Sequence, residues 1–416
     1  MEQISSEENN KDLNGVIMKS ILIVSHCMEL GGAERALLGL LEHMDYSAYK
    51  VDLFLLRHQG ELMKHIPKEV NLLPEDLSYS CLAVPIREVI RKGKFSIIYH
   101  RWIGKEKARK RIKELGISSD NAIGLEYSHK FTKSCMPAIS NKEYDLAISF
   151  LTPHYFALDK VKAKKKIAWI HTDYSRVSID VESEYEMWNG YDYIAAVSEG
   201  VAQQFLVPFP SLKNKVYVIE NMLSESLIYK QANEPIGDVF KSENVNLLSV
   251  GRFSHAKNFD HIPAILQFIH KEIPNAVWYL IGYGGDEPLI REEIHKHHMN
   301  DSVIVLGKKE NPYPYIKACD LYVQPSRYEG KAVAVREAQM LGKPVVITDY
   351  ETSASQLANG IDGVIVPMDP KNCAAGIVGL LQDKKKMKKL AEQCKANDYT
   401  NKDEINKLYN LIEGNF

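Results

Sequence analysis

The sequence predicts an α/β protein made of two domains, each built on a parallel β-sheet. Its 416 residues exceed what one hydrophobic core usually organises. In both halves, short apolar runs alternate with segments of helical periodicity, which is the pattern of a parallel sheet with helices on both faces. Between the halves, Asn221 to Glu243 is polar, contains Pro235 and Gly237, and lacks a clear period.

The composition is that of an ordinary soluble protein, with 45% hydrophobic and 25% charged residues. The net charge of −2 gives no global electrostatic argument for nucleic acid. The cysteines are scattered without a CxxC spacing, which is typical of reduced thiols in a cytosol. No apolar run approaches the roughly 20 residues of a membrane helix. Residues 1–17 are polar and acidic, so we expect a disordered tail there and no secretory signal.

In the first half, apolar runs predict strands at 20–26, 51–56, 144–150, 166–170, 192–197 and 216–219. Gly31 and Gly32 follow the first of these strands, and a helical pattern begins directly after them. A strand, a glycine loop and a helix can cradle an anion, because glycine lets backbone N–H groups approach a ligand. The same pattern is equally typical of a tight turn.

In the second half, strands are predicted at 245–251, 278–282, 303–307, 320–323, 344–348 and 363–367. Glu329 lies in the turn after strand 320–323, and the following helix is expected to end at Gly342. Glu337, eight positions after Glu329, lies in that helix. Open α/β sheets bind ligands at the carboxyl ends of their strands, so Glu329 should face a crevice. Free N–H groups at 330–332 would favour a phosphate or a polyhydroxylated ring there. A surface loop with a solvated helix is the alternative.

Two cations, Arg252 and Lys257, follow strand 245–251. Such a pair can grip a diphosphate and neutralise its departure, although loop cations are otherwise surface salt-bridge partners. His171 ends strand 166–170 and should face the same crevice, although a lone histidine is more often structural. Glu182, Glu184 and Glu186 do not share one helix face, so we expect a charged surface rather than a metal cluster.

The run from Glu329 to Glu337, followed by G-K-P-V-V, resembles the Glu-x7-Glu signature of family 4 retaining glycosyltransferases. The run G-R-F-S-H-A-K-N, which starts at Gly251, resembles a second landmark of that family. The resemblance extends from about Lys19 to about Lys395 and implies the GT-B fold, in which two Rossmann-like domains face a central cleft.

The residues that the resemblance assigns to the site lie at strand ends or in the helix after Glu329. They are Glu329 and His171 for catalysis; Arg252, Lys257 and Gly32 for the donor diphosphate; Gly330, Lys331 and Ala332 for backbone contacts to the donor sugar and phosphate; Glu337 for the ribose; and Lys308 for the nucleobase. Many relatives have an aromatic residue and a glycine where this chain has Lys331 and Ala332. The identity of the transferred sugar therefore stays open. No metal or other cofactor is expected, because the two cations take its place.

The implied reaction transfers a hexose or N-acetylhexosamine, with retention, from a nucleotide-diphosphate sugar to a lipid-linked or growing surface polysaccharide. UDP is the expected nucleotide. The variant E-G-K at residues 329–331 also resembles that of bacterial capsule enzymes. The expected organisation is an acceptor-binding domain at 18–222, a linker at 223–243, a nucleotide-sugar-binding domain at 244–395, and a helix at 396–416 that crosses back to the first domain.

Between Arg87 and Lys113, eleven Lys or Arg stand against two Glu and are interleaved with aromatic and aliphatic residues. This pattern favours a protein that is cytoplasmic and lies on the anionic inner leaflet of the membrane. A solvated helix pair is the alternative, and nucleic acid is a weaker one, because no recognised binding module is present.

Two other functions fit the same architecture. One is a sugar-nucleotide epimerase, which would act on a UDP-sugar without any acceptor. The other is a non-catalytic partner in glycan assembly, which would have lost donor binding. NAD-dependent dehydrogenation is disfavoured, because neither glycine loop has the G-x-G-x-x-G spacing with an acidic partner.

Overall fold

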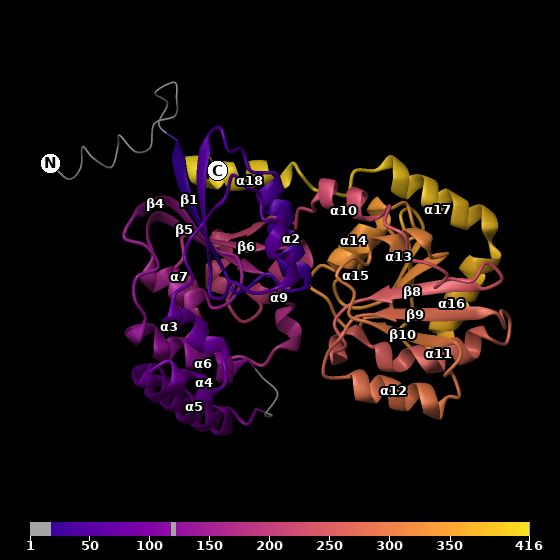
Figure 1. The fold of residues 1–416 in the computed structure, drawn as a ribbon, viewed down its shortest axis with the longest axis horizontal. Coiled ribbons are helices and arrows are strands. Elements are labelled where there is room, and N and C mark those ends of the chain that lie inside the picture. The colour runs from indigo at the N-terminus through magenta and orange to yellow at the C-terminus, as the bar shows by residue number, and fades with distance from the viewer. Residues whose placement is uncertain (1–17, 118–121, 416) are drawn as a thin grey trace. The chain divides into compact units, whose positions relative to one another are not determined.

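The computed structural model describes residues 18–117 and 122–415, so the expected tail at 1–17 lies outside the described residues. These residues form two compact units. Unit 1 comprises the chain up to Glu29, Leu40–Glu220 and Asp403 onwards, whereas unit 2 comprises Leu30–Gly39 and Asn221–Lys402. Each unit contains one parallel sheet with helices packed around it (Figure 1).

The sheet of unit 1 has seven strands in the order β3-β2-β1-β4-β5-β6-β7. Its strands are β1 (Lys19–Ser25), β2 (Tyr49–Leu55), β3 (Asn71–Leu72), β4 (Glu143–Ser149), β5 (Lys162–Ile170), β6 (Tyr193–Ala196) and β7 (Val216–Val218). Its helices are α3 (Leu77–Ser80), α4 (Ile86–Arg91), α5 (Phe95–Leu115), α6 (Ile123–Thr132), α7 (His154–Lys160), α8 (Val181–Asn189), α9 (Glu199–Leu206) and α18 (Glu404–Glu413).

The sheet of unit 2 has six strands in the order β10-β9-β8-β11-β12-β13. Its strands are β8 (Val245–Val250), β9 (Ala276–Ile281), β10 (Val303–Gly307), β11 (Leu321–Gln324), β12 (Val345–Thr348) and β13 (Val364–Val366). Its helices are α10 (Glu225–Gln231), α11 (Ile262–Ile269), α12 (Glu287–Lys296), α13 (Tyr313–Ala318), α14 (Val333–Met340), α15 (Ser353–Gln356), α16 (Pro370–Gln382) and α17 (Lys384–Ala396). Helix α2 (Gly32–Glu42) begins in the segment that groups with this unit.

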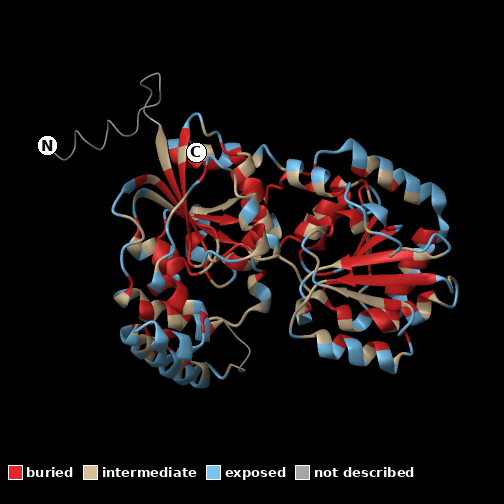
Figure 2. Ribbon diagram, in the orientation of Figure 1, coloured by how far each residue is buried: buried red, intermediate tan, exposed pale blue. Residues whose placement is uncertain are grey.

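Short 3-10 turns connect several of these elements. They are η1 (Glu61–His65), η2 (Cys81–Ala83), η3 (Lys133–Cys135), η4 (Tyr174–Arg176), η5 (Pro210–Lys215), η6 (His255–Lys257) and η7 (Phe259–His261). Strands in both sheets are largely buried, whereas the outer faces of the helices are exposed (Figure 2). In β8 the neighbouring residues Leu247 and Leu248 belong to separate buried clusters, because successive side chains of a strand point to opposite faces. Unit 2 therefore has a hydrophobic core on each face of its sheet, as the parallel α/β prediction requires.

Two segments belong to unit 2 in a way that the sequence did not suggest. Leu30–Gly39 packs within unit 2, where a Cβ atom added to Gly39 would lie 2.0 Å from the carbonyl oxygen of Met222. The expected linker at 223–243 contains α10, and its Leu223 and Ile228 are buried in a core cluster of unit 2. This stretch is therefore part of the second core rather than an unstructured connection.

The last helix packs within unit 1. In α18 the ring of Tyr409 stacks on Tyr49 with ring centroids 4.5 Å apart. The ammonium of Lys165 donates a hydrogen bond of 3.0 Å to the carbonyl of Leu411 in the same helix. Among the described residues, no helix is both long enough and apolar enough to cross a bilayer.

Candidate functional site

An ion pair joins two of the predicted site residues in unit 2. Lys257 ends the 3-10 turn η6 after β8, and Glu329 lies in the loop after β11. The Lys257 Nζ atom is 2.5 Å from Glu329 Oε1, and the two side chains are only 20% and 11% exposed. Partial burial strengthens the attraction between the charges, so this contact fixes the two loops against each other.

A chain of buried hydrogen bonds holds the carboxylate of Glu329 in place. The Ser326 hydroxyl donates to Glu329 Oε1 at 2.6 Å, and Gln324 Nε2 donates to the Ser326 oxygen at 2.9 Å. The Tyr322 hydroxyl donates to Gln324 Oε1 at 2.8 Å. The Thr352 hydroxyl donates to the Glu329 carbonyl oxygen at 2.6 Å, so both the side chain and the backbone of Glu329 are anchored. Such a network presents a preorganised carboxylate.

A second ion pair supports the same two loops. Arg327 binds Asp260 through two hydrogen bonds, of 2.9 and 2.6 Å. The Arg327 backbone N–H also donates to the Ala256 carbonyl at 2.7 Å, next to Lys257. Burial opposes ionisation of Asp260, but the hydrogen bond and charge of Arg327 outweigh it and lower the pKa of this carboxyl. Arg327 therefore positions the turn that carries Lys257.

Glu337 lies in α14 and is 2% exposed. Its Oε1 atom accepts a hydrogen bond of 3.0 Å from Arg35 and one of 2.9 Å from the Tyr313 hydroxyl. Arg35 also donates to the Tyr313 oxygen, and its guanidinium lies 4.9 Å from the centre of the Tyr313 ring. Burial would lower the pKa of Arg35, but the charge of Glu337 raises it above its ordinary value. The carboxylate expected to hold the ribose is thus already bound by an arginine of Leu30–Gly39.

The backbone after Glu329 differs from the expectation in one respect. We expected the N–H groups of 330–332 to be free for a ligand, and this is wrong for Ala332, whose N–H donates to Gln356 Oε1 at 2.6 Å. Gln356 also donates to the Ala332 carbonyl at 3.3 Å, because the α15 segment lies directly against this loop. Lys331 is 8% exposed, and its ammonium donates to the Ser355 carbonyl at 2.8 Å.

Three further predicted site residues, Gly32, Arg252 and Lys308, belong to unit 2. Gly32 begins α2, and a Cβ atom there would be 3.7 Å from the side chain of Val333, the first residue of α14. Arg252 is exposed, and its guanidinium forms no ion pair with any described residue. The Lys308 ammonium lies 4.7 Å from the centre of the Tyr283 ring. Gly282, in the same loop as Tyr283, approaches the Arg252 loop so closely that a Cβ atom would lie 1.9 Å from the Gly251 carbonyl oxygen.

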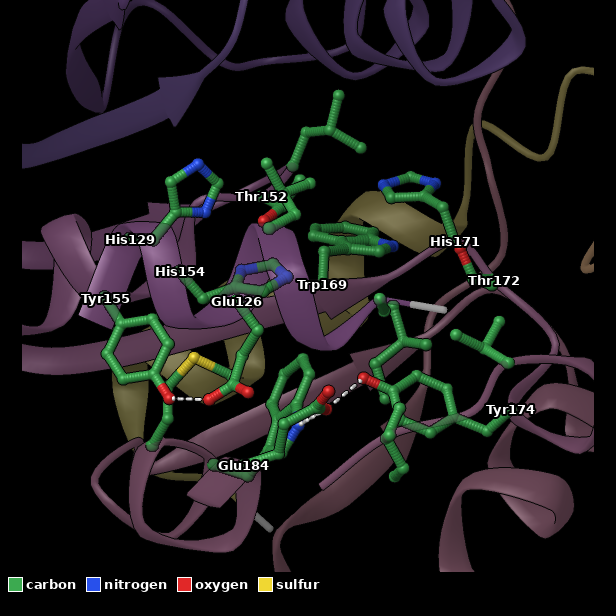
Figure 3. Close-up of a pocket in the computed structure, with 18 residues that line it drawn as sticks. Glu126, His129, Thr152, His154, Tyr155, Trp169, His171, Thr172, Tyr174 and Glu184 are labelled. Atoms are coloured by element: carbon green, nitrogen blue, oxygen red, sulfur yellow. Dashed lines mark hydrogen bonds between the residues drawn. The ribbon is translucent and has the colours of Figure 1, made fainter. Parts of the chain in front are cut away.

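His171 belongs to unit 1 and lies at the carboxyl end of β5. Its Nε2–H donates to the Phe150 carbonyl at 2.9 Å, so the Nδ1 atom carries the lone pair. The surrounding side chains exclude water from the ring and lower the pKa of His171 to about 4. The imidazole is therefore neutral at pH 7. It lines a cavity of about 180 Å³ between β5, α6, α7 and α8 (Figure 3).

The sequence predicted a charged surface at Glu182, Glu184 and Glu186. This prediction is wrong for Glu184. In α8, positions two apart lie on nearly opposite sides of the helix. Glu182 and Glu186 are therefore exposed, and they pair with Arg111 and Lys130. Glu184 faces inward instead, where it accepts hydrogen bonds from Tyr174 at 3.0 Å and Trp188 at 3.1 Å. Burial raises the pKa of Glu184 to about 7.

The raised pKa of Glu184 predicts a pH-dependent effect of the substitution Glu184→Gln. The ordinary pKa of a glutamate side chain is 4.5, whereas that of Glu184 in the folded protein is about 7. Between these two pH values the folded protein holds a proton on Glu184 that the unfolded chain releases. The carboxyl therefore makes the free energy of unfolding fall as the pH rises through this window. Glutamine lacks this proton equilibrium, so the stability of Glu184→Gln relative to the native protein should rise by up to about 3 kcal/mol across it.

Thermal melts between pH 4.5 and 8 would measure this difference. Glu186→Gln, at an exposed position of the same helix, is the control and should show little change with pH. A difference between Glu184→Gln and the native protein that stays constant with pH would contradict the raised pKa.

The pair Arg327–Asp260 predicts a loss of stability in unit 2. Replacing Asp260 by Ala leaves a guanidinium, only 17% exposed, without its carboxylate. We expect the apparent free energy of unfolding to fall by about 2 kcal/mol. Urea titration of both variants measures these losses, and Glu287→Ala, which removes the more exposed pair with Arg291, should cost less than about 0.5 kcal/mol. Equal losses in the two variants would show that Asp260 has no special positioning role.

Comparison with known proteins finds a family match over part of the chain. Residues 232–397 match the family model described as glycosyl transferases group 1. The amylovoran biosynthesis glycosyltransferase AmsD of Erwinia amylovora is 27% identical over 166 residues, which are 39% of this chain and 45% of that protein. A second relative, from Campylobacter jejuni, is 26% identical over 208 residues, 49% of this chain and 54% of its own. It is named N-acetylgalactosamine-N,N'-diacetylbacillosaminyl-diphospho-undecaprenol 4-alpha-N-acetylgalactosaminyltransferase.

The matches to the first curated relatives are partial, because they span 37%, 45% and 23% of those proteins. The similarity in fold covers far more of the chain. TarM of S. aureus, solved in complex with UDP among other ligands, superposes with a TM-score of 0.66 over 95% of this chain and 100% of its own, at 12% identity. The chain therefore carries a domain of the group 1, or family 4, glycosyltransferases at residues 232–397, in a protein with two Rossmann-like halves of the GT-B fold.

Proposed function

We propose that this chain is a retaining glycosyltransferase that moves a hexose or N-acetylhexosamine from a UDP-sugar to a hydroxyl of a lipid-linked or growing surface polysaccharide. The observation that carries this proposal is the anchored pair of Lys257 and Glu329 inside the matched family domain. It offers a cation for a phosphate and a carboxylate for sugar hydroxyls at the ends of adjacent strands. Beside it, Glu337 is the candidate for the ribose hydroxyls.

The donor diphosphate would bind to Lys257 and Arg252. Lys257 gives up part of its contact with Glu329 when a phosphate arrives, and the exposed Arg252 has no competing ion pair among the described residues. Two charge-assisted contacts to the leaving group stabilise the transition state more than the ground state, because negative charge grows on the diphosphate as its bond to the sugar breaks. In this scheme the cations do the work of a metal ion. The neighbour TarM was solved with UDP, which supports this choice of nucleotide.

The proposed chemistry is a front-face displacement. The bond between the anomeric carbon and the diphosphate oxygen breaks, a bond to the acceptor oxygen forms on the same face, and the acceptor proton passes to the departing diphosphate oxygen. Glu329 orients the sugar, and its hydrogen-bond network keeps it from moving during the reaction. His171 would hydrogen-bond the sugar or the acceptor through Nδ1, because Nε2 is already used by Phe150.

The proposed acceptor is linked to a lipid. The name of the Campylobacter jejuni relative includes a diphospho-undecaprenol, and that of AmsD includes amylovoran biosynthesis. An enzyme with such an acceptor must work at a membrane surface, which agrees with the basic stretch of unit 1.

Helices α4 and α5 carry the candidate membrane face. Phe95, Tyr99 and Trp102 are 66%, 58% and 59% exposed and lie on one side of α5, because they are spaced by four and three positions. Ile86 and Ile90 of α4 are 52% and 50% exposed. The same stretch of the chain carries exposed cations, which include Arg87, Arg91, Lys92, Lys105 and Lys107. Aromatic and aliphatic side chains together with cations suit an anionic leaflet.

Lys257→Ala tests the donor site. We expect the affinity for UDP to fall by about 10- to 100-fold, since a charge-assisted hydrogen bond contributes about 1.5–3 kcal/mol, and transfer to fall by orders of magnitude. Titration calorimetry with UDP and consumption of a UDP-sugar panel measure both effects. Lys384→Ala, at an exposed position of α17, is the matched control. Unchanged affinity and turnover in Lys257→Ala would refute the assigned role.

The membrane face predicts selective binding to anionic vesicles. The native chain should sediment with phosphatidylglycerol vesicles but not with phosphatidylcholine vesicles, and salt should weaken the binding. The double variant Phe95→Ser and Trp102→Ser should bind the vesicles several-fold more weakly. Val207→Ser is the control, because it removes a 73% exposed side chain at the end of α9, and it should bind as the native chain does. Equal binding by all three proteins would exclude this face as the contact.

A further inference from the structure

Two side chains at the ends of the α15 segment hold the loop that carries Glu329. Residues 329–332 form this donor loop, and Thr352 and Gln356 form the clasp that holds it. The Thr352 hydroxyl donates to the Glu329 carbonyl oxygen at 2.6 Å. Thr352 is 3% exposed, so water hardly competes for this hydrogen bond. The clasp therefore fixes the backbone at the carboxylate that is proposed to bind the sugar.

The clasp holds a second point of the donor loop, three residues further along the chain. The Ala332 N–H donates to Gln356 Oε1 at 2.6 Å, and Gln356 Nε2 donates to the Ala332 carbonyl oxygen at 3.3 Å. The buried amide of Gln356 can form both bonds because it carries a donor and an acceptor. Between the two points, the Lys331 ammonium donates to the Ser355 carbonyl oxygen at 2.8 Å. The donor loop is thus bonded to the α15 segment at three of its four residues.

The groups proposed to bind the nucleotide are held by other contacts. Arg327 is bonded to the turn that carries Lys257, through its backbone and its side chain. The side chains of Arg35 and Tyr313 donate hydrogen bonds to Glu337. None of these bonds involves the clasp. Loosening the clasp should therefore disturb the donor loop and leave the nucleotide-binding groups in place.

We propose that the clasp sets the recognition of the transferred sugar, with Thr352 and Gln356 as positioning residues that act through the donor loop. The inference rests on the glycosyltransferase function proposed above, because it assumes that Glu329 binds the sugar. A carboxylate that orients a sugar must meet its hydroxyls at hydrogen-bond distance, so small shifts of its backbone weaken both binding and turnover. UDP has no sugar, and its binding should not depend on this geometry.

Four variants separate the clasp from the rest of the α15 segment. Thr352→Val and Gln356→Met remove the bonds to the donor loop at nearly constant volume. Thr352→Ser keeps the hydroxyl and should restore native behaviour. Ser355→Ala is the matched control, because its hydroxyl donates to the Thr352 carbonyl at 2.8 Å and the carbonyl bonded to the donor loop is kept. Thermal melts show which variants are folded.

Titration calorimetry with UDP and with UDP-sugars measures the predicted separation. The UDP-sugar is the one of UDP-glucose, UDP-galactose, UDP-N-acetylglucosamine and UDP-N-acetylgalactosamine that the native chain consumes fastest. In Thr352→Val and Gln356→Met, the affinity for this donor should fall by about fivefold or more, and its turnover should fall further. The affinity for UDP should not fall by more than about twofold in any of the four variants.

Hydrogen exchange tests the clasp without any ligand. The Ala332 amide loses its acceptor in Gln356→Met, so it should exchange at least about tenfold faster than in the native chain. In Ser355→Ala it should exchange at the native rate. Native exchange at Ala332 in Gln356→Met would overturn the inference, because the bond would then not hold the donor loop.

The binding outcomes separate this inference from the function on which it rests. If the native chain binds UDP and a UDP-sugar but both clasp variants bind the UDP-sugar as the native chain does, the inference is overturned and the proposed function stands. Equal losses for UDP and the UDP-sugar would also overturn it, because the clasp would then support the whole donor site. If the native chain binds neither UDP nor any of the four UDP-sugars, the proposed function fails and the inference fails with it.

Discussion

The ion pair between Lys257 and Glu329 is the interaction on which the proposed donor site depends. Each charge is mostly buried and needs a partner, because an unpaired charge at such a position is costly. A nucleotide sugar can replace both partners at once, since its diphosphate can neutralise the lysine while its hydroxyls donate to the glutamate. The pair thus holds the two loops in a geometry close to the bound one, and little ordering remains to be done when the donor arrives.

A second buried pair organises the neighbouring helix. Arg35 and Glu337 are separated by 302 positions, yet they form one of the least exposed ion pairs of unit 2, with Tyr313 between them. Through this contact the helix that follows the glycine loop is tied to the carboxylate proposed for the ribose. A ribose hydroxyl that binds Glu337 would therefore alter the ion pair of Glu337 with Arg35. Nucleotide binding would in this way be coupled to the glycine loop.

The strands and the helix ending at Gly342 could be predicted from the sequence because local patterns specify them, whereas the roles of Lys257 and Glu329 come from the family resemblance and stay predictions. Buried parallel strands are continuous apolar runs, and the end of α14 is set by hydrogen bonds from Gly342 to Gln339 and from Lys343 to Ala338. Contacts between distant segments could not be predicted. Arg35 lies in the G-G-A-E-R run, but nothing near it points to Glu337. Gln356 and its bonds to Ala332 carry no local signal either.

The errors have local physical causes. The three glutamates of α8 do not share one helix face, and this pattern predicted a charged surface, whereas the same helical period turns Glu184 toward Tyr174 and Trp188. Helix α10 was missed because it is short and polar, and its few buried side chains acquire meaning only when the second core forms. In both cases the tertiary environment decided what composition alone left open.

The most direct test of the account is a thermodynamic cycle for UDP binding over Lys257→Ala, Glu329→Gln and the double variant. UDP carries the diphosphate but no sugar, so in the native chain it must draw Lys257 away from Glu329 without giving the glutamate a new partner. The account predicts that Glu329→Gln binds UDP about tenfold more tightly than the native chain, a gain of about 1.4 kcal/mol, and that the gain disappears in the Lys257→Ala background. An unchanged affinity in Glu329→Gln, or a gain that persists without Lys257, would contradict the claim that these two side chains form the donor site together.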